Sequence, residues 1–360
     1  MNGRFVIDAS VLHITFLEPC QDLYRYHHSN RQLSTVYCEI MNNLLILGGS
    51  GFVGKSMQMG LSGLQFENLV SASSGLRYGT TEQSESSTIR YDSWDIRATC
   101  DFPTSFDTIV HAATPASAQL NTDEPNEMFK LIVQGMENVI EFASRHQKPP
   151  TVLFTSSGAV YGDIPESISN VPEDWNGAVD PYQPSSAYAE GKRAAEFLLS
   201  VATSRGLCKG LLARMFAFSG ADLPMDRHFA IGNFVRDAVT TRTIQIRSDG
   251  SSIRSYMDQQ DMADWLLRIL EVGQTNTIYH VGSERSISIR DLAQLIAMRT
   301  ETILQQKVAV EVQGLKSPLD GVSRYVPSTL ATRQALGVNE TISLEESIDS
   351  MIHKAIREYL

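Results

Sequence analysis

The sequence predicts an α/β protein built on a doubly wound parallel sheet, followed by a smaller C-terminal α/β lobe. Short apolar runs alternate with amphipathic helical segments from residue 43 to about residue 215. Since parallel strands are joined by crossovers that are usually helices, this alternation is typical of a parallel sheet with helices on both faces. Beyond residue 215 the predicted elements become shorter. We therefore expect an N-terminal extension over 1–40, a first domain over 41–215, and a second lobe over 216–360 with some segments returning to the first domain.

Five apolar runs account for the strands of the predicted sheet. They cover residues 44–47, 69–72, 108–111, 152–155 and 210–213. Helical periodicity predicts helices over 128–144 and 188–204, and a last helix over 344–359. A stretch rich in serine and threonine, from Thr80 to Thr88, follows the second run, and its composition predicts an exposed loop.

The composition argues against several classes of protein. Apolar residues make up 42% of the chain and charged residues 20%, which is typical of a chain that folds around a core. Thirty basic and 41 acidic residues leave a net charge of −11, which argues against nucleic acid or an anionic membrane as a partner. Four widely spaced cysteines argue against a disulfide framework and a metal site, so we expect a reducing, cytoplasmic environment. No apolar run approaches the about 18 residues of a membrane-spanning helix.

A glycine-rich segment, Gly48–Gly54, follows the first predicted strand and opens a helix. Glycines there let the backbone turn tightly and let a pyrophosphate approach the positive end of the helix. Their spacing, GxxGxxG, is a variant of the dinucleotide-binding fingerprint. The overlapping segment Gly49–Ser56 also satisfies the phosphate-loop pattern, which needs a later strand that ends in an acidic residue to hold Mg²⁺. The predicted strands end instead in Ser71, His111 and Thr155, which favours the dinucleotide interpretation.

Candidate acid–base chemistry lies at the start of the predicted helix over 188–204. Tyr188 and Lys192 form a YxxxK pattern, and their spacing places both side chains on one helical face. A phenol with its ordinary pKa of about 10 is a poor base at neutral pH, but a neighbouring ammonium stabilises the phenolate and lowers that pKa. The strand over 152–155 leads into hydroxyl groups that end at Ser157, at the sheet edge where open α/β sheets bind ligands. We therefore expect Lys192 to lower the pKa of Tyr188, and Ser157 to bond the reacting oxygen.

Six motifs, taken in order, carry a resemblance to a known family. They are GGSGFVG, WDI (Trp94–Ile96), VHAATPAS (Val110–Ser117), TSSGAVYG, YAEGK and IRSYMDQQD (Ile253–Asp261). With them the chain resembles the extended short-chain dehydrogenases/reductases, in the nucleotide-sugar epimerase/dehydratase branch, over roughly residues 43–350. The resemblance implies a Rossmann-type domain that binds NAD or NADP, a C-terminal lobe that binds a nucleotide-sugar substrate, and a homodimer.

The resemblance also implies roles for individual residues. Ser157 would orient the reacting oxygen, Tyr188 would be the acid/base, and Lys192 would tune Tyr188 and hold the nicotinamide ribose. Asp95 and Ile96 would frame the adenine. The residues expected to bind the cofactor are Gly48, Gly51, Phe52, Val53, Gly54, Ser73, Arg77, Asp95, Ile96, Ala112, Ala113, Thr114, Tyr188 and Lys192. The residues expected to bind the substrate are Ser117, Ser157, Asn233, Arg254 and Arg324.

Two departures from the family pattern bear on the reaction. Family dehydratases carry an acidic pair after the serine or threonine, but this chain has Gly158 and Ala159, so 4,6-dehydration by the usual route is disfavoured. NAD-preferring members place a carboxylate at the end of the second strand. This chain offers Ser73 and then Arg77, which suit the 2′-phosphate of NADP, so NADP is slightly favoured over NAD.

The sequence therefore predicts an NAD(P)-dependent enzyme that modifies a nucleotide-linked sugar by hydride transfer, at C4, with a Ser–Tyr–Lys triad. Reduction of a 4-keto sugar is the favoured reaction. Redox-neutral 4-epimerisation is the next alternative, and 4,6-dehydration with substitute acids is the third. A regulator that binds the cofactor without catalysis is the alternative from a different class, and the intact triad argues against it.

Overall fold

The structure is a computed structural model that describes residues 41–62, 64–74, 80–83, 88–100, 102, 105–114, 117–227, 229–315 and 322–360. The predicted N-terminal extension over 1–40 and Arg77 lie outside the described residues. What the sequence predicts for them stays a prediction.

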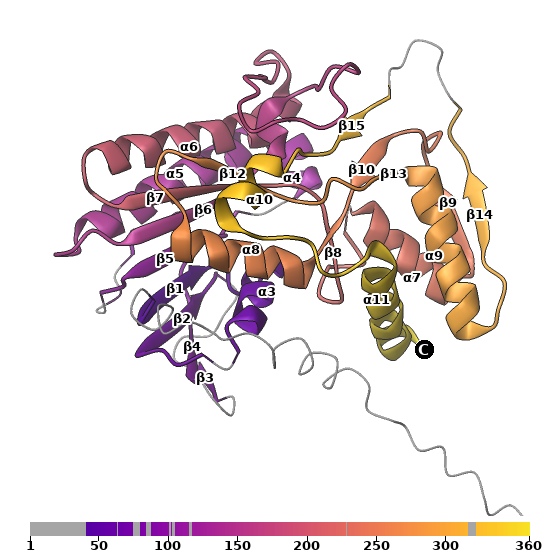
Figure 1. The fold of residues 1–360 in the computed structure, drawn as a ribbon, viewed down its shortest axis with the longest axis horizontal. Helices are drawn as coiled ribbons and strands as arrows, with labels where there is room; N and C mark the ends of the chain where they lie inside the picture. The colour runs from indigo at the N-terminus through magenta and orange to yellow at the C-terminus, as the bar shows by residue number, and fades with distance from the viewer. Residues whose placement is uncertain are drawn as a thin grey trace, which may run out of the picture. The chain divides into compact units, whose positions relative to one another are not determined.

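One eight-stranded sheet organises the first part of the described chain (Figure 1). Its strand order is β12-β7-β6-β5-β1-β2-β4-β3; seven strands are parallel, and β3 pairs antiparallel with β4 at one edge. The strands are β1 (Asn43–Leu47), β2 (Asn68–Ala72), β3 (Thr80–Gln83), β4 (Thr88–Asp92), β5 (Thr108–His111), β6 (Thr151–Ser157), β7 (Lys209–Met215) and β12 (Ile278–Val281). The doubly wound α/β class is confirmed, and all five predicted strands are present within a residue or two of their expected bounds.

The loop predicted over Thr80–Thr88 is wrong at both ends. β3 occupies Thr80–Gln83, and β4 begins at Thr88 and pairs in parallel with β2. Threonine is β-branched and fits a pleated sheet well, so a stretch rich in it is compatible with strands. What decides between loop and strand here is the pairing of β4 with β2 and of β3 with β4, which composition does not reveal.

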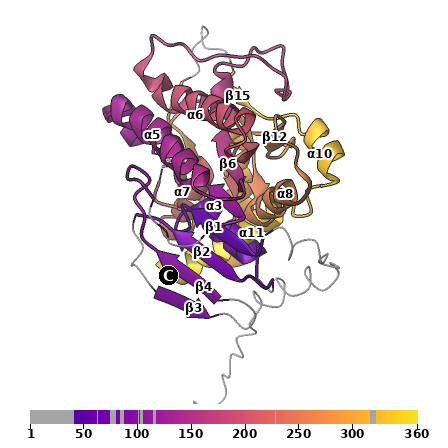
Figure 2. The same cartoon turned by 90° about the vertical axis from the view of Figure 1, so that its left-hand side faces the viewer.

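Helices cover both faces of the sheet (Figures 1 and 2). On one face lie α5 (Pro125–Ser144) and α6 (Ala187–Ser204), which pack against each other, and on the other lie α3 (Phe52–Gly60) and α8 (Gln259–Val272). Shorter helices are α4 (Ala118–Asp123), η1 (Gly158–Tyr161) and η2 (Pro184–Ser186). Apolar side chains of the strands, α5 and α6 form one buried core.

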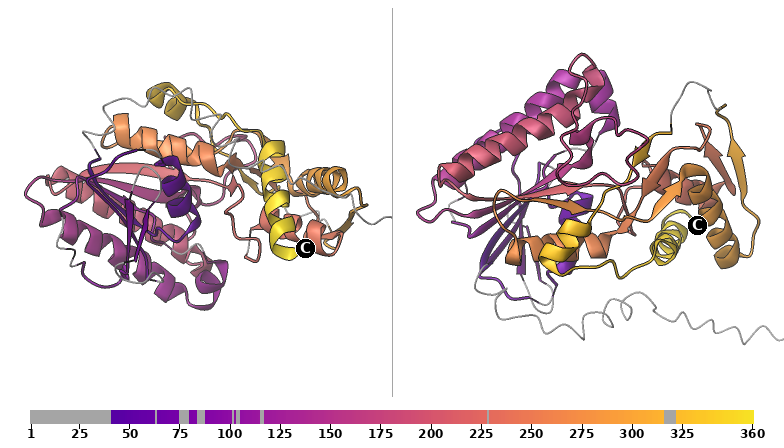
Figure 3. Two further views of the ribbon diagram at one scale, coloured as in Figure 1. Left: turned by 90° about the horizontal axis from the view of Figure 1, so that it is seen from below. Right: turned by 45° about the horizontal axis from the view of Figure 1, so that its top comes forward.

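The chain after β7 builds a second core (Figure 3). It is formed by α7 (Ala230–Thr240), α9 (Ile289–Leu304), α11 (Leu344–Tyr359) and the paired strands β9 (Thr243–Ile246) and β14 (Ala309–Val312). The remaining elements are β8 (Phe218–Ser219), β10 (Ile253–Ser255), β11 (Met257–Asp258), β13 (Ser286–Ser288), β15 (Arg324–Tyr325) and α10 (Leu330–Leu336). The predicted last helix coincides with α11, whereas the predicted domain boundary at residue 215 stays a prediction.

The topology places the candidate site at the carboxyl ends of the strands. β1 pairs with β2 on one side and with β5 on the other, so the strand order reverses between β1 and β5. In open α/β sheets, ligands bind in the crevice at such a switch point. Within the part of the chain that the structure describes, no helix is both long and apolar enough to cross a membrane.

Candidate active site

The predicted glycine turn follows β1 and leads into α3. Gly48 has a φ of +87°, and a Cβ added to it would lie 2.5 Å from the carbonyl oxygen of Ala112, so only glycine fits. A Cβ at Gly54 would lie 2.4 Å from the carbonyl oxygen of Gly48, which ties the start of α3 to the turn. Gly51 is the N-cap of α3, and no side chain among the described residues caps it. The first backbone N–H groups of α3, at Phe52–Val53, are therefore available to an anion.

Other predicted cofactor contacts lie around this turn. Ser73 follows β2, and its hydroxyl oxygen lies 2.7 Å from that of Ser50 in the glycine turn. Ala113 follows β5, with its backbone nitrogen 2.8 Å from the position of an added Gly48 Cβ. The hydroxyl oxygen of Thr114 is buried and has no hydrogen-bond partner among the described residues. The glycine cradle, the uncapped helix start and this unpartnered hydroxyl fit a dinucleotide cofactor.

The expected adenine contacts are held by their own neighbours. Arg97 forms an ion pair with Asp95 at 2.5 Å, and its hydrogen bonds lower the pKa of that carboxyl. Ile96 is buried, and its carbonyl oxygen accepts a 2.7 Å hydrogen bond from the Asn138 side chain. The structure therefore fixes this segment against α5 without testing its role toward adenine.

The three predicted catalytic residues lie together where β6 ends and α6 begins. Ser157 is the last residue of β6, and its hydroxyl oxygen accepts a 3.2 Å hydrogen bond from the Ala159 amide. The Ser157 side chain lies close enough to Tyr188 to lower the pKa of the Tyr188 phenol. Lys192, one turn further along α6, has its Nζ 5.7 Å from the centre of the Tyr188 ring and donates a 2.8 Å hydrogen bond to the carbonyl oxygen of Thr155.

The electrostatics of this group differ from the expectation. We expected Lys192 to lower the pKa of Tyr188, but the structure shows that pKa raised. Desolvation by the surrounding protein raises the pKa of the Tyr188 phenol more than the neighbouring Ser157 side chain lowers it. Burial also lowers the pKa of Lys192 to about 7, so the lysine carries only part of its charge at neutral pH. Tyr188 is therefore held in its proton-donating form.

The predicted substrate residues are spread over several elements. Arg254, in β10, donates hydrogen bonds to the Ile253 and Ser323 carbonyl oxygens, and burial lowers its pKa. Ser117 caps α4 by accepting a 3.1 Å hydrogen bond from the Leu120 amide. The other two bond nearby carbonyl oxygens: Asn233 that of Arg227 at 2.7 Å, and Arg324 that of Ser169 at 3.4 Å. Their roles toward a substrate stay predictions.

Sequence reasoning missed Tyr325, which borders Ser157. Tyr325, in β15, has its hydroxyl oxygen 3.4 Å from Ser157 Oγ, and the Phe216 ring lies 4.9 Å from the Tyr325 ring, centre to centre. A signal for Tyr325 was present, since it directly follows Arg324 in the motif SRYVPST. Asn121 was also missed: its side-chain oxygen accepts a 2.8 Å hydrogen bond from the Tyr188 amide and so fixes the start of α6.

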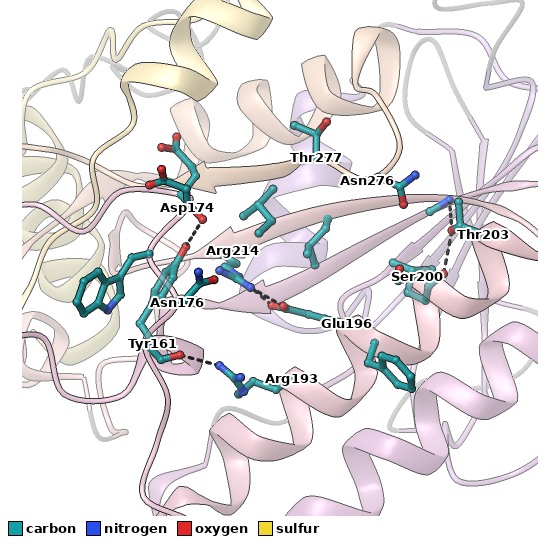
Figure 4. Close-up of a pocket in the computed structure, with 18 residues that line it drawn as sticks. Tyr161, Asp174, Asn176, Arg193, Glu196, Ser200, Thr203, Arg214, Asn276 and Thr277 are labelled. Carbon is teal, nitrogen blue, oxygen red and sulfur yellow. Dashed lines mark hydrogen bonds and ion pairs between the residues drawn. The ribbon is translucent and has the colours of Figure 1, made fainter.

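A cavity of about 650 Å³ is lined by residues of α6, β7, β12 and the segment 173–177 (Figure 4). Glu196 and Arg214 form a 2.7 Å ion pair in it, with each side chain only 11% exposed. Ser156 donates a 2.5 Å hydrogen bond to Glu196, and the charge of Glu196 raises the pKa of Lys192 against the effect of burial. The cavity therefore adjoins the predicted catalytic residues through Glu196, which contacts Ser156 and acts on Lys192.

Comparison with known proteins places the chain in a family. The model of the NAD-dependent epimerase/dehydratase family matches residues 44–282. UDP-glucuronic acid decarboxylase 3 of Arabidopsis thaliana is 26% identical over 322 residues, which are 88% of this chain and 89% of that protein.

Solved structures share the fold. A UDP-glucose 4-epimerase of Thermotoga maritima with UDP-glucose has a TM-score of 0.73 and 18% identity, covering 88% of this chain and 99% of that one. RMD of Pseudomonas aeruginosa complexed with NADPH has a TM-score of 0.69 and 20% identity, with the same two coverages. Since the family model spans more than half of its length, the chain belongs to the NAD-dependent epimerase/dehydratase family and is an enzyme.

Proposed function

We propose that this enzyme reduces the 4-keto group of a nucleotide-linked sugar, with Ser157, Tyr188 and Lys192 as the catalytic group and NADP as its cofactor. One observation carries the proposal. Tyr188 lies beside Ser157 with the pKa of its phenol raised, so that it stays protonated, while Gly158 and Ala159 offer no acidic side chain next to them. A phenol that donates a proton is what carbonyl reduction needs, whereas elimination of water needs a carboxyl group at those positions.

The catalytic group would act on the oxygen at C4. Ser157 donates a hydrogen bond to that oxygen, and Tyr188 gives it a proton as negative charge develops. Lys192 stabilises the phenolate left on Tyr188 when its ammonium is charged. Hydride at C4 is what a bound reduced nicotinamide supplies in such a site. Gly48, Gly51 and Thr114 are the residues that would hold the cofactor nearby.

The preference for NADP rests on the end of β2. Ser73 follows β2 at the position where NAD-preferring members carry a carboxylate, and its hydroxyl oxygen lies 2.7 Å from that of Ser50 in the glycine turn. The complex of RMD with NADPH shows that the fold accommodates this cofactor. The nucleotide-sugar class of the substrate is supported by the UDP-glucose in the similar epimerase.

Two other reactions begin at the same carbon and are the alternatives. Epimerisation at C4 is favoured by the likeness to UDP-glucose 4-epimerase, and decarboxylation by the likeness to UDP-glucuronic acid decarboxylases. Oxidation at C4 of a sugar with a C6 carboxylate makes a β-keto acid, which loses CO₂ readily. Both reactions return the hydride and leave the cofactor unchanged, so they start from the oxidised cofactor.

Cofactor identity separates these reactions. Freshly purified protein is denatured, and any nicotinamide nucleotide that it releases is identified. Protein that releases none and consumes NADPH with a 4-keto sugar nucleotide supports the reductase. Retained NAD, with conversion of UDP-glucose or release of CO₂ from UDP-glucuronic acid, contradicts it and identifies an epimerase or a decarboxylase.

The variant Tyr188→Phe tests the catalytic group. It removes the hydroxyl and keeps the ring, so we expect turnover to fall about 100-fold or more, as is typical for loss of a general acid, while NADPH still binds. Tyr182→Phe is the matched control, because Tyr182 is 91% exposed. A Tyr188→Phe protein with normal turnover would contradict the assignment and favour a different acid. Equal behaviour of both proteins in every assay would favour a regulator.

A further inference from the structure

The C-terminal lobe places a second phenol beside the predicted catalytic serine. The hydroxyl oxygen of Tyr325 lies 3.4 Å from Ser157 Oγ, and it is enclosed by protein although the ring is partly exposed. Tyr188 lies near the same serine from α6, close enough for the Ser157 side chain to lower the pKa of its phenol. Ser157 therefore has a phenol on each side, Tyr188 from α6 and Tyr325 from β15.

Gly158 makes the room for Tyr325. A Cβ added at residue 158 would lie 2.8 Å from the Tyr325 hydroxyl oxygen and 2.6 Å from the ring of Phe216. Any side chain at this position would displace the phenol or the ring that packs on it. The glycine that replaces the dehydratase acid and the presence of Tyr325 beside Ser157 are thus two parts of one arrangement.

The hydrogen bonds around Ser157 give Tyr325 a defined task. The Tyr325 hydroxyl has two acceptors within reach, the carbonyl oxygen of Met215 at 3.3 Å and Ser157 Oγ at 3.4 Å. Ser157 Oγ already accepts one hydrogen bond, from the amide of Ala159. A hydroxyl oxygen accepts two hydrogen bonds, so a bond from Tyr325 would fill the second place. The Ser157 O–H is then left to donate, toward Tyr188 or toward a substrate oxygen at the same point.

Tyr325 also connects the serine to the predicted nucleotide contact. β10 and β15 pair in parallel with Arg254 opposite Tyr325. A ligand that binds at Arg254 would thus contact the strand that pairs with β15, which carries Tyr325. Burial raises the pKa of Tyr325 strongly, so its hydroxyl remains a donor at any physiological pH.

We propose that Tyr325 is a positioning residue for the reaction: by donating a hydrogen bond to Ser157, it directs the serine hydroxyl toward the oxygen that reacts. The proposal rests on the proposed function, since it takes Ser157 as the group that bonds this oxygen. It assigns Tyr325 no contact with the substrate.

The test is a double-mutant cycle of Tyr325→Phe and Ser157→Ala, followed by turnover. Tyr325→Phe should lower kcat about 10-fold and leave KM within about 3-fold, because orientation of one donor is lost while binding is kept. In the Ser157→Ala background the same substitution should change kcat less than 2-fold, since its target is gone. Tyr182→Phe is the matched control. An equal loss of kcat in both backgrounds, or no loss in the first, would overturn the proposal.

Thermal unfolding of the same four proteins gives a readout independent of the sugar. Tyr325→Phe should lower the Tm by a smaller amount when Ser157 is already alanine, because the hydrogen bond is then absent from both proteins. Equal losses of Tm would overturn the proposal even if no substrate were known. A wild-type protein that turns over no nucleotide sugar contradicts the proposed function instead. The double-mutant cycle of Tm values then still tests whether Tyr325 and Ser157 interact.

Discussion

Lys192 shows how far one residue's surroundings can shift its chemistry. It is 2% exposed, its ammonium has a 2.8 Å hydrogen bond to the Thr155 carbonyl oxygen, and the Phe154 ring lies 4.6 Å below. Burial lowers its pKa to about 7, and the charge of Glu196 acts in the opposite direction. The helical spacing of Tyr188 and Lys192 predicted their shared face correctly. It did not predict the sign of the pKa shift of Tyr188, because spacing carries no information on burial.

A pH dependence of the rate follows from Lys192. Its ammonium is fully charged only well below pH 7 and loses its charge as the pH rises through about 7, so the rate of reduction should fall over that range. Glu196→Gln removes the charge that supports the ammonium, and the fall should move to lower pH by about half a unit or more. The measurement is kcat from pH 5.5 to 9 with cofactor saturated. Glu358→Gln, at an exposed position on α11, should leave the profile in place, and an unmoved profile in the Glu196 variant would contradict the coupling.

At the scale of elements, Asp258 connects four elements that follow β7: β11, α8, α11 and β8. It ends β11 and caps α8, where its carboxylate accepts a 2.8 Å hydrogen bond from the Gln260 amide. Ser347, in α11, donates a 2.5 Å hydrogen bond to the same carboxylate and lies 2.8 Å from the Ser219 hydroxyl of β8. Despite these bonds, burial raises the pKa of Asp258 to about 6. Above that pH the Asp258 carboxylate is charged, and its burial then lowers the stability of the folded protein even though its hydrogen bonds connect the elements.

Asp258→Asn should reveal this cost. The raised pKa means that Asp258 contributes stability fully below pH 3.8, its unfolded value, and that this contribution is lost as the pH rises through about 6. Two pKa units correspond to about 3 kcal/mol, and asparagine, which also caps helices, carries no charge. The free energy of unfolding of the variant, relative to that of the wild type, should therefore rise by about 1–3 kcal/mol from pH 4 to pH 7. Urea unfolding at both values measures it, with the exposed Asp226→Asn as control; a constant difference would refute the assignment.

The elements also show what the sequence could and could not predict. The five apolar runs and the long amphipathic helices were predicted correctly because strands buried on both faces and helices with one apolar face have strong periodic patterns. β3, β4 and β12 were missed as members of the sheet, since their place depends on pairing with distant strands. The same limit applies to the site: Tyr325 reaches Ser157 through a fold that joins residues 168 positions apart.

At the scale of the whole molecule, two neutral histidines lie inside the sheet. His111 ends β5, with its ring 5.2 Å from that of Phe154, and His280 lies in β12. The Nδ1–H of His280 donates to the Ser328 carbonyl oxygen at 2.8 Å, and its Nε2 accepts from the Tyr161 hydroxyl at 2.5 Å. Burial lowers the pKa of each histidine to about 3, so the folded protein excludes protons that the unfolded chain takes up near pH 6.5. Both residues therefore make the fold less stable as the pH falls below 6.5.

His280→Gln should remove one of the two histidines that bind a proton in the unfolded chain but not in the folded protein. A depressed pKa gives stability that is present above the unfolded value of 6.5 and is lost on acidification, at about 1.4 kcal/mol per pH unit for one group. Glutamine can offer an N–H to Ser328 and an oxygen to Tyr161, but it does not titrate. The variant is therefore expected to be less stable than the wild type at pH 7.5, through poorer packing, and to recover by about 2 kcal/mol relative to it between pH 6.5 and 4.5. Urea unfolding across this range measures the recovery, and His353→Gln, at an exposed position on α11, should show none. If the free energies of unfolding of the His280 variant and the wild type differ by a constant amount across this pH range, His280 takes up its proton in the folded protein. That would require the hydrogen bond from Tyr161 to break and water to reach the sheet.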